Sequence, residues 1–195
     1  QVNHLSRPLL SIITPAYNEE HRRPRTLVNL FAFLERQTYS FEIVVVENGS
    51  SDRTYELAQT FAEEHTSVRV LRETRRGKGL AVRRGMLESR GEYRFMCDAD
   101  FSMPIEQINR FFPPALVEAD IVIASREAPG AVRYDEPEYR HLVGRAFNWM
   151  IRMILLPGLH DTQCGFKCFH ARAAEELFPA QRLTGWAFDV EVLFI

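Results

Sequence analysis

Short, almost continuously apolar runs alternate with amphipathic stretches along most of the chain. The apolar runs have the length of buried strands and lie at residues 9–13, 41–46, 68–71, 93–97 and 121–124. Helical spacing lies between them, at 25–37, from a cap at Ser51 or Asp52 to about residue 64, at 77–90 and at 105–112. Strands that are apolar on both faces and alternate with helices are typical of parallel sheets. The pattern therefore predicts an α/β fold with helices on both faces of a parallel sheet.

Polar residues follow the carboxyl ends of several predicted strands. They are Glu19, Glu47, Asp98 and Ser125. Because the carboxyl ends of parallel strands share one edge of the sheet, residues far apart in the sequence meet there. We therefore expect a binding cleft along that edge.

An acidic pair, Asp98-Ala99-Asp100, ends the fourth predicted strand. Neither acid has an obvious local partner, and two like charges this close repel each other. A divalent cation shared with phosphate oxygens would remove that repulsion, and Mg²⁺ or Mn²⁺ suits such ligands. Alternatively, the two acids cap the following helix, whose start Pro104 marks. The spacing alone leaves both interpretations open.

A basic turn, Arg76-Gly77-Lys78-Gly79, opens the third predicted helix. Its glycines let the backbone approach a ligand, while Lys78 supplies positive charge. Neither a P-loop nor a GxGxxG dinucleotide fingerprint is present. The surrounding basic cluster at 69–94 lacks interleaved exposed aromatic residues, and the net charge is −2, so we expect no nucleic-acid binding.

Composition narrows the class of protein. The chain has 195 residues, of which 46% are hydrophobic and 26% charged, enough for one buried core. Its three cysteines, Cys97, Cys164 and Cys168, suggest no disulfide framework or zinc site, which predicts a reducing compartment. The N-terminus lacks the layout of a signal peptide. The sequence also contains no run of about 18 apolar residues, which is the length needed to span a bilayer.

The alternation of strands and helices breaks near residue 127. Residues 127–138 combine prolines, a glycine and charges, which predicts a mobile loop. Residues 139–156 then have the pattern of a long apolar helix with arginines spaced along it. This helix either covers the sheet or lies partly in a membrane interface, with its arginines reaching the headgroups.

Two further motifs lie near the C-terminus. Residues 161–167 place polar groups around a glycine, and residues 186–191 place Asp189 and Glu191 in an apolar frame. Because a buried, unpaired acid is costly, we expect Asp189 or Glu191 to be either paired or functional.

Taken in order, these motifs resemble those of family-2 glycosyltransferases. They are the segment Ser11 to Glu20, the turn 47–52, Arg76-Gly77-Lys78-Gly79, Asp98-Ala99-Asp100, Ser125-Arg126, and the motifs at 161–167 and 186–191. The resemblance covers the whole chain. Within the family, the string Asp-Thr-Gln-Cys-Gly-Phe-Lys at 161–167 is most similar to dolichyl-phosphate β-glucosyltransferases and their polyprenyl-phosphate relatives.

The resemblance implies a GT-A fold, which is a Rossmann-like, mostly parallel sheet with helices on both faces. It implies a single domain over residues 1–195, apparently truncated at the C-terminus, because relatives continue beyond that point. The implied reaction is an inverting transfer of glucose from UDP-glucose to a polyprenyl or dolichyl phosphate, with Mg²⁺ or Mn²⁺ as cofactor. The implied location is cytoplasmic, at the cytoplasmic face of a membrane.

The resemblance also implies roles for individual residues. The nucleotide-sugar site would comprise Pro15, Tyr17, Glu19, Glu47, Lys78, Asp98, Ala99, Asp100 and Gln163. The metal would be held by Asp98 and Asp100, which join Asp189 and Arg126 in the catalytic set. The acceptor phosphate would be bound by Arg126, Arg133 and Lys167. The chain departs from the family at Glu47 and Asn48, which replace common acids, and at Ser102, where mannosyl synthases can carry another metal ligand.

The acceptor decides what Asp189 does. A sugar hydroxyl needs a general base, whereas a lipid phosphate, with a second pKa of about 6, is already anionic. We therefore expect Asp189 to orient cations or the donor sugar rather than to abstract a proton. The alternatives are mannosyl transfer from GDP-mannose, a sugar hydroxyl acceptor with Asp189 as base, and a nucleotide-sugar-binding module without turnover.

Overall fold

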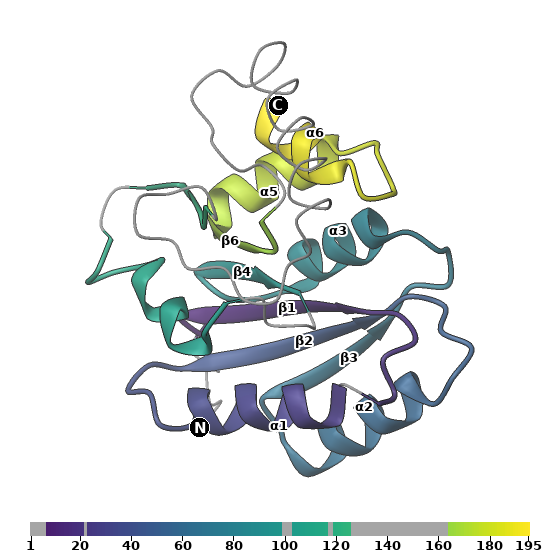
Figure 1. Cartoon of the computed structure of the whole chain (residues 1–195). Helices are drawn as coiled ribbons and strands as arrows, with labels where there is room; N and C mark the ends of the chain where they lie inside the picture. Colours follow the sequence, from purple (N-terminus) through teal and green to yellow (C-terminus); the bar gives the residue numbers. More distant parts are fainter. Residues whose placement is uncertain (1–6, 22, 99–102, 117–118, 126–163) are drawn as a thin grey trace, which may run out of the picture.

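A six-stranded sheet with the order β3-β2-β1-β4-β6-β5 forms the centre of the molecule (Figure 1). The computed structural model describes residues 7–21, 23–98, 103–116, 119–125 and 164–195. The strands are β1 (Leu10–Ala16), β2 (Phe41–Glu47), β3 (Val68–Arg72), β4 (Tyr93–Cys97), β5 (Ile121–Ile123) and β6 (Phe166–His170). The helices are α1 (Arg23–Leu34), α2 (Thr54–Glu64), α3 (Lys78–Glu88), α5 (Ala171–Ala180), α6 (Phe188–Phe194) and the 3₁₀-helix η1 (Ile105–Arg110).

The sheet is mostly parallel but not entirely so. Strands β3, β2, β1 and β4 pair in parallel, whereas β6 runs antiparallel to both β4 and β5. The mostly parallel sheet that the family resemblance implies is therefore confirmed, although the apolar pattern did not identify the antiparallel strand β6. Lys167 interrupts the apolar run of β6. An antiparallel strand also needs no helical crossover before it, so the alternation of strands and helices does not predict it.

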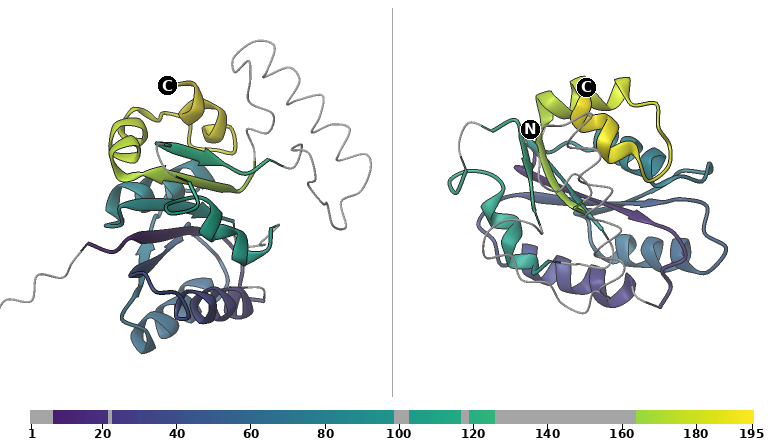
Figure 2. Two further views of the ribbon diagram at one scale, coloured as in Figure 1. Left: turned by 90° about the vertical axis from the view of Figure 1, so that its left-hand side faces the viewer. Right: turned by 45° about the horizontal axis from the view of Figure 1, so that its top comes forward.

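Helices cover both faces of the sheet, as predicted. Alternate residues of each strand point to opposite faces, so Ile12 and Ile43 pack on one side, with α1, α2 and η1, while Ile13 and Val44 pack on the other, with α3, α5 and α6. Figures 1 and 2 show the two helical layers with the sheet between them. The carboxyl ends of the parallel strands β1, β2 and β4 lie at the edge where the sequence predicts a site.

Several element boundaries differ from the predicted ones for local reasons. Strand β1 continues through Pro15 to Ala16, because its pairing with β4 ends at Ile13 and a proline is tolerated where only one neighbour is bonded. Helix α2 begins at Thr54, and its N-cap, Arg53, has no side-chain cap bond. The helix expected at 105–112 is the shorter η1, which ends ahead of a proline pair that cannot supply backbone N–H groups.

Two predicted elements, the loop at 127–138 and the apolar helix at 139–156, lie outside the described residues. Within the described ranges, no helix combines the length and apolar character that a bilayer crossing requires.

Candidate nucleotide-sugar site

A cavity of about 580 Å³ lies at the carboxyl ends of β1, β2 and β4. This size is typical of pockets for small molecules and cofactors. Its lining comes from segments far apart in the sequence: Pro15, Ala16, Tyr17, Glu19, Asn48, Arg76, Gly77, Lys78, Asp98 and Trp186. Five residues of the predicted nucleotide-sugar site are thus brought together here: Pro15, Tyr17, Glu19, Lys78 and Asp98.

An ion pair between Lys78 and Asp98 marks one part of this cavity. The Lys78 ammonium lies 2.7 Å from Asp98 Oδ1 and 2.8 Å from Oδ2. The partner of Asp98 is therefore distant in the sequence, and it comes close because the first turn of α3 reaches the end of β4. The capping alternative also fails for Asp98, since η1 has Pro104 as its N-cap and no side-chain cap bond.

Gly165 gives the Asp98 carboxylate the space it occupies. A Cβ atom at Gly165 would lie 2.3 Å from Asp98 Oδ2 and 2.7 Å from Cγ, far inside van der Waals contact. The glycine of the 161–167 motif therefore acts on the site through Asp98, at the turn that leads into β6.

The basic turn before α3 is held in place by Asn48. Its side-chain Nδ2 donates to Arg75 O at 2.6 Å, and its Oδ1 accepts from Gly77 N at 2.8 Å. Gly77 has a φ of +150°, and a Cβ there would meet the carbonyl oxygen of Thr184 at 2.4 Å. The turn thus needs an amide at position 48 and a glycine at position 77 to present Lys78.

The loop after β1 is tied to the loop after β2. Asn18 has a φ of 52°, in the left-handed region that asparagine tolerates, and its Oδ1 accepts from Ser51 N at 2.9 Å. The Glu20 amide donates to Asp52 Oδ2 at 3.1 Å, and the Glu19 amide donates to Thr54 Oγ1 at 2.8 Å. These cross-links fix the segment that carries the cavity residues Tyr17 and Glu19. Asp52 Oδ1 also accepts a hydrogen bond from Thr54 N at 3.0 Å, at the start of α2, where the sequence predicted a cap at Ser51 or Asp52.

Two aromatic rings of the lining have cations over their faces. The Arg76 guanidinium lies 5.2 Å from the Tyr17 ring centre, and Lys78 Nζ lies 4.7 Å from that of Trp186. Both distances fall within the range of cation–π contacts. The site therefore offers flat apolar surfaces beside positive charge, which suits a ligand with rings and phosphates.

Glu47, predicted as a nucleotide-binding residue, is not among the residues that line the cavity. Its carboxylate is buried, with Oε1 accepting from Ser50 N and Oε2 lying 3.3 Å from Arg72 Nε. The side chain thus shapes the turn behind the cavity. A direct contact between Glu47 and a nucleotide stays a prediction.

A second ion pair lies behind the site, between Lys167 on β6 and Asp189 on α6. Lys167 Nζ lies 2.6 Å from Asp189 Oδ1 and donates to Cys164 O, also at 2.6 Å. Burial raises the pKa of Asp189, opposed by the attraction of Lys167 and Lys78. Of the two acids expected to be either paired or functional, Asp189 is thus paired. Lys167 was predicted to bind an acceptor phosphate, but its ammonium is buried and bonded to protein groups, so that role stays a prediction.

The other predicted site residues lie outside the described part of the chain. They are Ala99, Asp100, Arg126, Arg133 and Gln163, together with Ser102. Trp186 is the first residue of the motif at 186–191, but the sequence did not predict that it binds a ligand. The sequence feature that could have indicated this role is an aromatic residue between a glycine and a short helix. Its contact with Lys78 could not be predicted, because the two residues are far apart in the sequence.

The described residues of the cavity supply some of the ligands that a hard divalent cation would need. Asp98 presents carboxylate oxygens to the cavity, the ligand type that Mg²⁺ and Mn²⁺ prefer. Among residues 7–21, 23–98, 103–116, 119–125 and 164–195, no three His, Cys, Asp or Glu side chains gather as a metal cluster. A metal at Asp98 would therefore need ligands from elsewhere, such as Asp100, phosphate oxygens or water.

Comparison with known families gives one match that spans most of the chain. The family described as Glycosyl transferase family 2 matches residues 11–178, from β1 to the interior of α5.

Curated relatives of the chain carry the name dolichyl-phosphate β-glucosyltransferase. One from Trichomonas vaginalis is 36% identical over 95% of this chain, and one from Dictyostelium discoideum is 34% identical over 99%. The human protein of this name is 33% identical over 95% of this chain. The chain spans only 58%, 63% and 62% of these three relatives, respectively.

Solved structures of glucosyl-3-phosphoglycerate synthase from Mycobacterium tuberculosis share the fold. One, a complex with Mn²⁺, UDP-glucose and phosphoglyceric acid, superposes with a TM-score of 0.68 at 20% identity. The match covers 95% of this chain and 64% of that one. The predicted GT-A fold is thus confirmed.

Proposed function

Because this chain belongs to glycosyltransferase family 2, we propose that it transfers glucose from UDP-glucose to the phosphate of a dolichol or another polyprenol, with inversion at the anomeric carbon. The names of the curated relatives support the transfer of glucose to dolichyl phosphate. The observation that carries the proposal is the Lys78–Asp98 ion pair in a cavity at the carboxyl edge of the sheet.

The residues that line the cavity suggest how the donor nucleotide sugar is oriented in it. Tyr17, with Arg76 over its ring, offers a surface for the uracil base, and the neighbouring Glu19 suits the ribose hydroxyls. Lys78 offers its ammonium to the diphosphate, and Asp98 keeps that ammonium in position through both carboxylate oxygens. The hexose would then lie beyond the diphosphate, on the side of Trp186.

The proposed reaction exchanges one glycosyl–oxygen bond for another. An oxygen of the acceptor phosphate attacks the anomeric carbon, and the bond from that carbon to the β-phosphate breaks, so that UDP leaves with the bonding electrons. The leaving group gains negative charge in the transition state, and a positioned cation such as Lys78 stabilises it. The acceptor phosphate is already anionic near neutral pH, so no base is required. This assigns Asp189 a positioning role rather than proton abstraction.

A divalent cation completes the proposed site, with Asp98 and Asp100 as its protein ligands. When bound, Mg²⁺ or Mn²⁺ would supply additional neutralisation of the diphosphate charge. Arg126 and Arg133 are the cations we propose for the acceptor phosphate. The lipid acceptor requires contact with a membrane surface, which we propose to be a cytoplasmic face.

Transfer of labelled glucose tests this proposal. The full-length protein is supplied with UDP-glucose and Mn²⁺, and with either dolichyl phosphate in vesicles or a soluble glucoside as acceptor. We expect label in the lipid phosphate, little with GDP-mannose as donor, and loss of transfer with Lys78→Met. Transfer to the glucoside that Asp189→Asn abolishes would contradict the lipid-phosphate acceptor. Tight binding of UDP-glucose without transfer to either acceptor would instead indicate a binding module.

A further inference from the structure

Trp186 is a large aromatic residue that the fold leaves in solvent. It is 73% exposed, yet it forms part of the cavity lining. Burying an indole is favourable, so a tryptophan left open at the rim of a ligand cavity is an informative exception. It does not serve as a core residue, because the neighbouring Phe188, which is 1% exposed, has that role.

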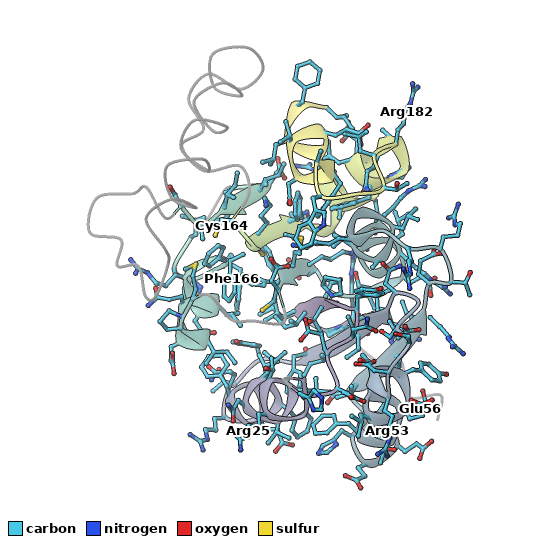
Figure 3. The ribbon with its side chains drawn as sticks, turned by 45° about the vertical axis from the view of Figure 1, so that its right-hand side comes forward. Arg25, Arg53, Glu56, Cys164, Phe166 and Arg182 are labelled. Carbon is cyan, nitrogen blue, oxygen red and sulfur yellow. The ribbon has the colours of Figure 1, made fainter. Side chains whose placement is uncertain are left out.

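The connection between α5 and α6 holds Trp186 in a defined place. Thr184 O accepts from Gly79 N at 2.9 Å, and Gln181 Nε2 donates to Gly79 O at 2.9 Å. A Cβ at Gly79 would lie 2.7 Å from Leu183 O, so the connection rests directly on the first turn of α3. Figure 3 shows Arg182 on the same connection pointing away from the protein. The loop is thus docked on the element that supplies Lys78.

The indole lies beside the cation that we assign to the diphosphate. Lys78 Nζ is 4.7 Å from the Trp186 ring centre and within 2.8 Å of both Asp98 carboxylate oxygens. In a nucleotide sugar, the hexose is bonded to the terminal phosphate of the diphosphate. A hexose bound with its diphosphate at Lys78 would therefore lie near the indole, whereas Tyr17, the other aromatic residue of the described lining, has Arg76 over its ring.

We propose that the exposed part of the Trp186 indole, which Lys78 leaves uncovered, is the stacking surface for the hexose of the donor. A pyranose ring presents C–H groups on its faces and hydroxyls around its rim, so it can pack on an indole while its hydroxyls stay hydrated. This proposal rests on the proposed function and adds to it a residue that recognises the transferred sugar rather than the nucleotide. The base would lie with Tyr17, and the acceptor would approach after the donor is bound.

Binding of UDP and of UDP-glucose, each with Mn²⁺, separates the hexose from the nucleotide. Isothermal titration is carried out on wild type, Trp186→Ala, Trp186→Phe and the control Leu183→Ala, which changes an exposed side chain of the same connection outside the cavity lining. We expect Trp186→Ala to weaken UDP-glucose binding about tenfold and to leave UDP binding unchanged. Trp186→Phe should retain most of the affinity, and Leu183→Ala should match wild type for both ligands.

Three outcomes would overturn the proposal. Equal losses for UDP and UDP-glucose would assign Trp186 to the nucleotide, and unchanged binding of both would remove it from the donor site. If wild type binds neither ligand, the proposed function fails as well, which distinguishes that failure from the first two.

Tryptophan fluorescence gives a second measurement that does not depend on affinity. The chain contains two tryptophans, so a signal that disappears in Trp186→Phe belongs to Trp186. We expect UDP-glucose to shift the emission to shorter wavelength and UDP to leave it unchanged, because only the hexose would cover the indole. A shift of the same size with UDP alone would contradict the proposal.

Discussion

Lys167 Nζ lies 2.6 Å from Asp189 Oδ1, and both side chains are almost wholly withdrawn from solvent, with 2% and 6% exposed. The pair joins β6 to α6. The turn before β6 also contains Gly165, which abuts the Asp98 carboxylate, and Cys164, whose carbonyl accepts from Lys167. One short segment thus supports Asp98 at the cavity and Asp189 behind it.

Loss of one partner of this pair should cost more than loss of both. Lys167→Met leaves a buried carboxylate without its counter-ion, and we expect the free energy of unfolding to fall by about 3–5 kcal/mol. Lys167→Met combined with Asp189→Leu should lose less, because no uncompensated charge remains. Urea denaturation of the single and double variants measures this.

A matched control uses the exposed pair of Arg172 and Asp120, whose atoms lie 2.9 Å apart with 75% and 59% of the side chains exposed. Arg172→Met should change stability by only about 0–1 kcal/mol. A double variant at Lys167 and Asp189 as unstable as the sum of its single changes would show that the two residues do not act as a pair.

The raised pKa of Asp189 predicts a pH dependence with a definite sign. Above the ordinary value of 3.8 and up to the raised value, the folded state keeps a proton that the unfolded state has released. Stability should therefore fall as pH rises through this window, and Asp189→Asn should lack that contribution. We expect the difference in unfolding free energy, wild type minus variant, to decrease with pH and then level off. A difference that grows with pH would mean that Lys167 outweighs burial and holds the pKa low.

Gly165→Ala should impair the site more than the fold. The added methyl group would displace the Asp98 carboxylate, so Lys78 loses its partner, and we expect UDP-glucose binding to weaken about tenfold or more. Gly185→Ala is the matched control, because its Cβ would meet nothing within 4 Å. Calorimetric titration of both variants with UDP-glucose provides the measurement. Equal affinities would show that the position of Asp98 does not depend on Gly165.

Asn48→Asp should lower the stability of the fold, although the family resemblance leads us to expect an acid at this position. A carboxylate cannot donate to Arg75 O, so we expect a loss of about 1–3 kcal/mol in unfolding free energy. Asn48→Ala removes both hydrogen bonds without adding a repulsive oxygen and should fall between Asn48→Asp and wild type. Chemical denaturation measures the unfolding free energies of the three proteins and so gives their order of stability. If the Asn48→Asp variant were as stable as wild type, the role assigned to the amide would be contradicted.

The sequence predicted the parts of the fold that depend on local pattern. Apolar runs identified β1 to β5, and the polar residues behind them converge at one edge because parallel strands are aligned. Strand β6 was not identified because Lys167 interrupts its apolar run and because it enters the sheet antiparallel. The family resemblance is confirmed by the match over residues 11–178.

The site was harder to predict where it depends on contacts between distant elements. The pairs Lys78–Asp98 and Lys167–Asp189 each join separate elements, and no spacing rule specifies them. The burial of Glu47 and the use of Asn48 as a bridge likewise follow from how two loops pack. Sequence alone indicated that these residues gather, whereas their partners required the fold.

The donor site itself is tested most directly by nucleotide-sugar binding with and without Mn²⁺. Titration calorimetry compares UDP-glucose and GDP-mannose on wild type, Asp98→Asn and Asp100→Ala. We expect wild type to prefer UDP-glucose and to bind it about tenfold or more tightly with Mn²⁺ than without, and both variants to lose this metal effect. Tighter binding of GDP-mannose, or equal binding by all three proteins with no effect of Mn²⁺, would contradict the account.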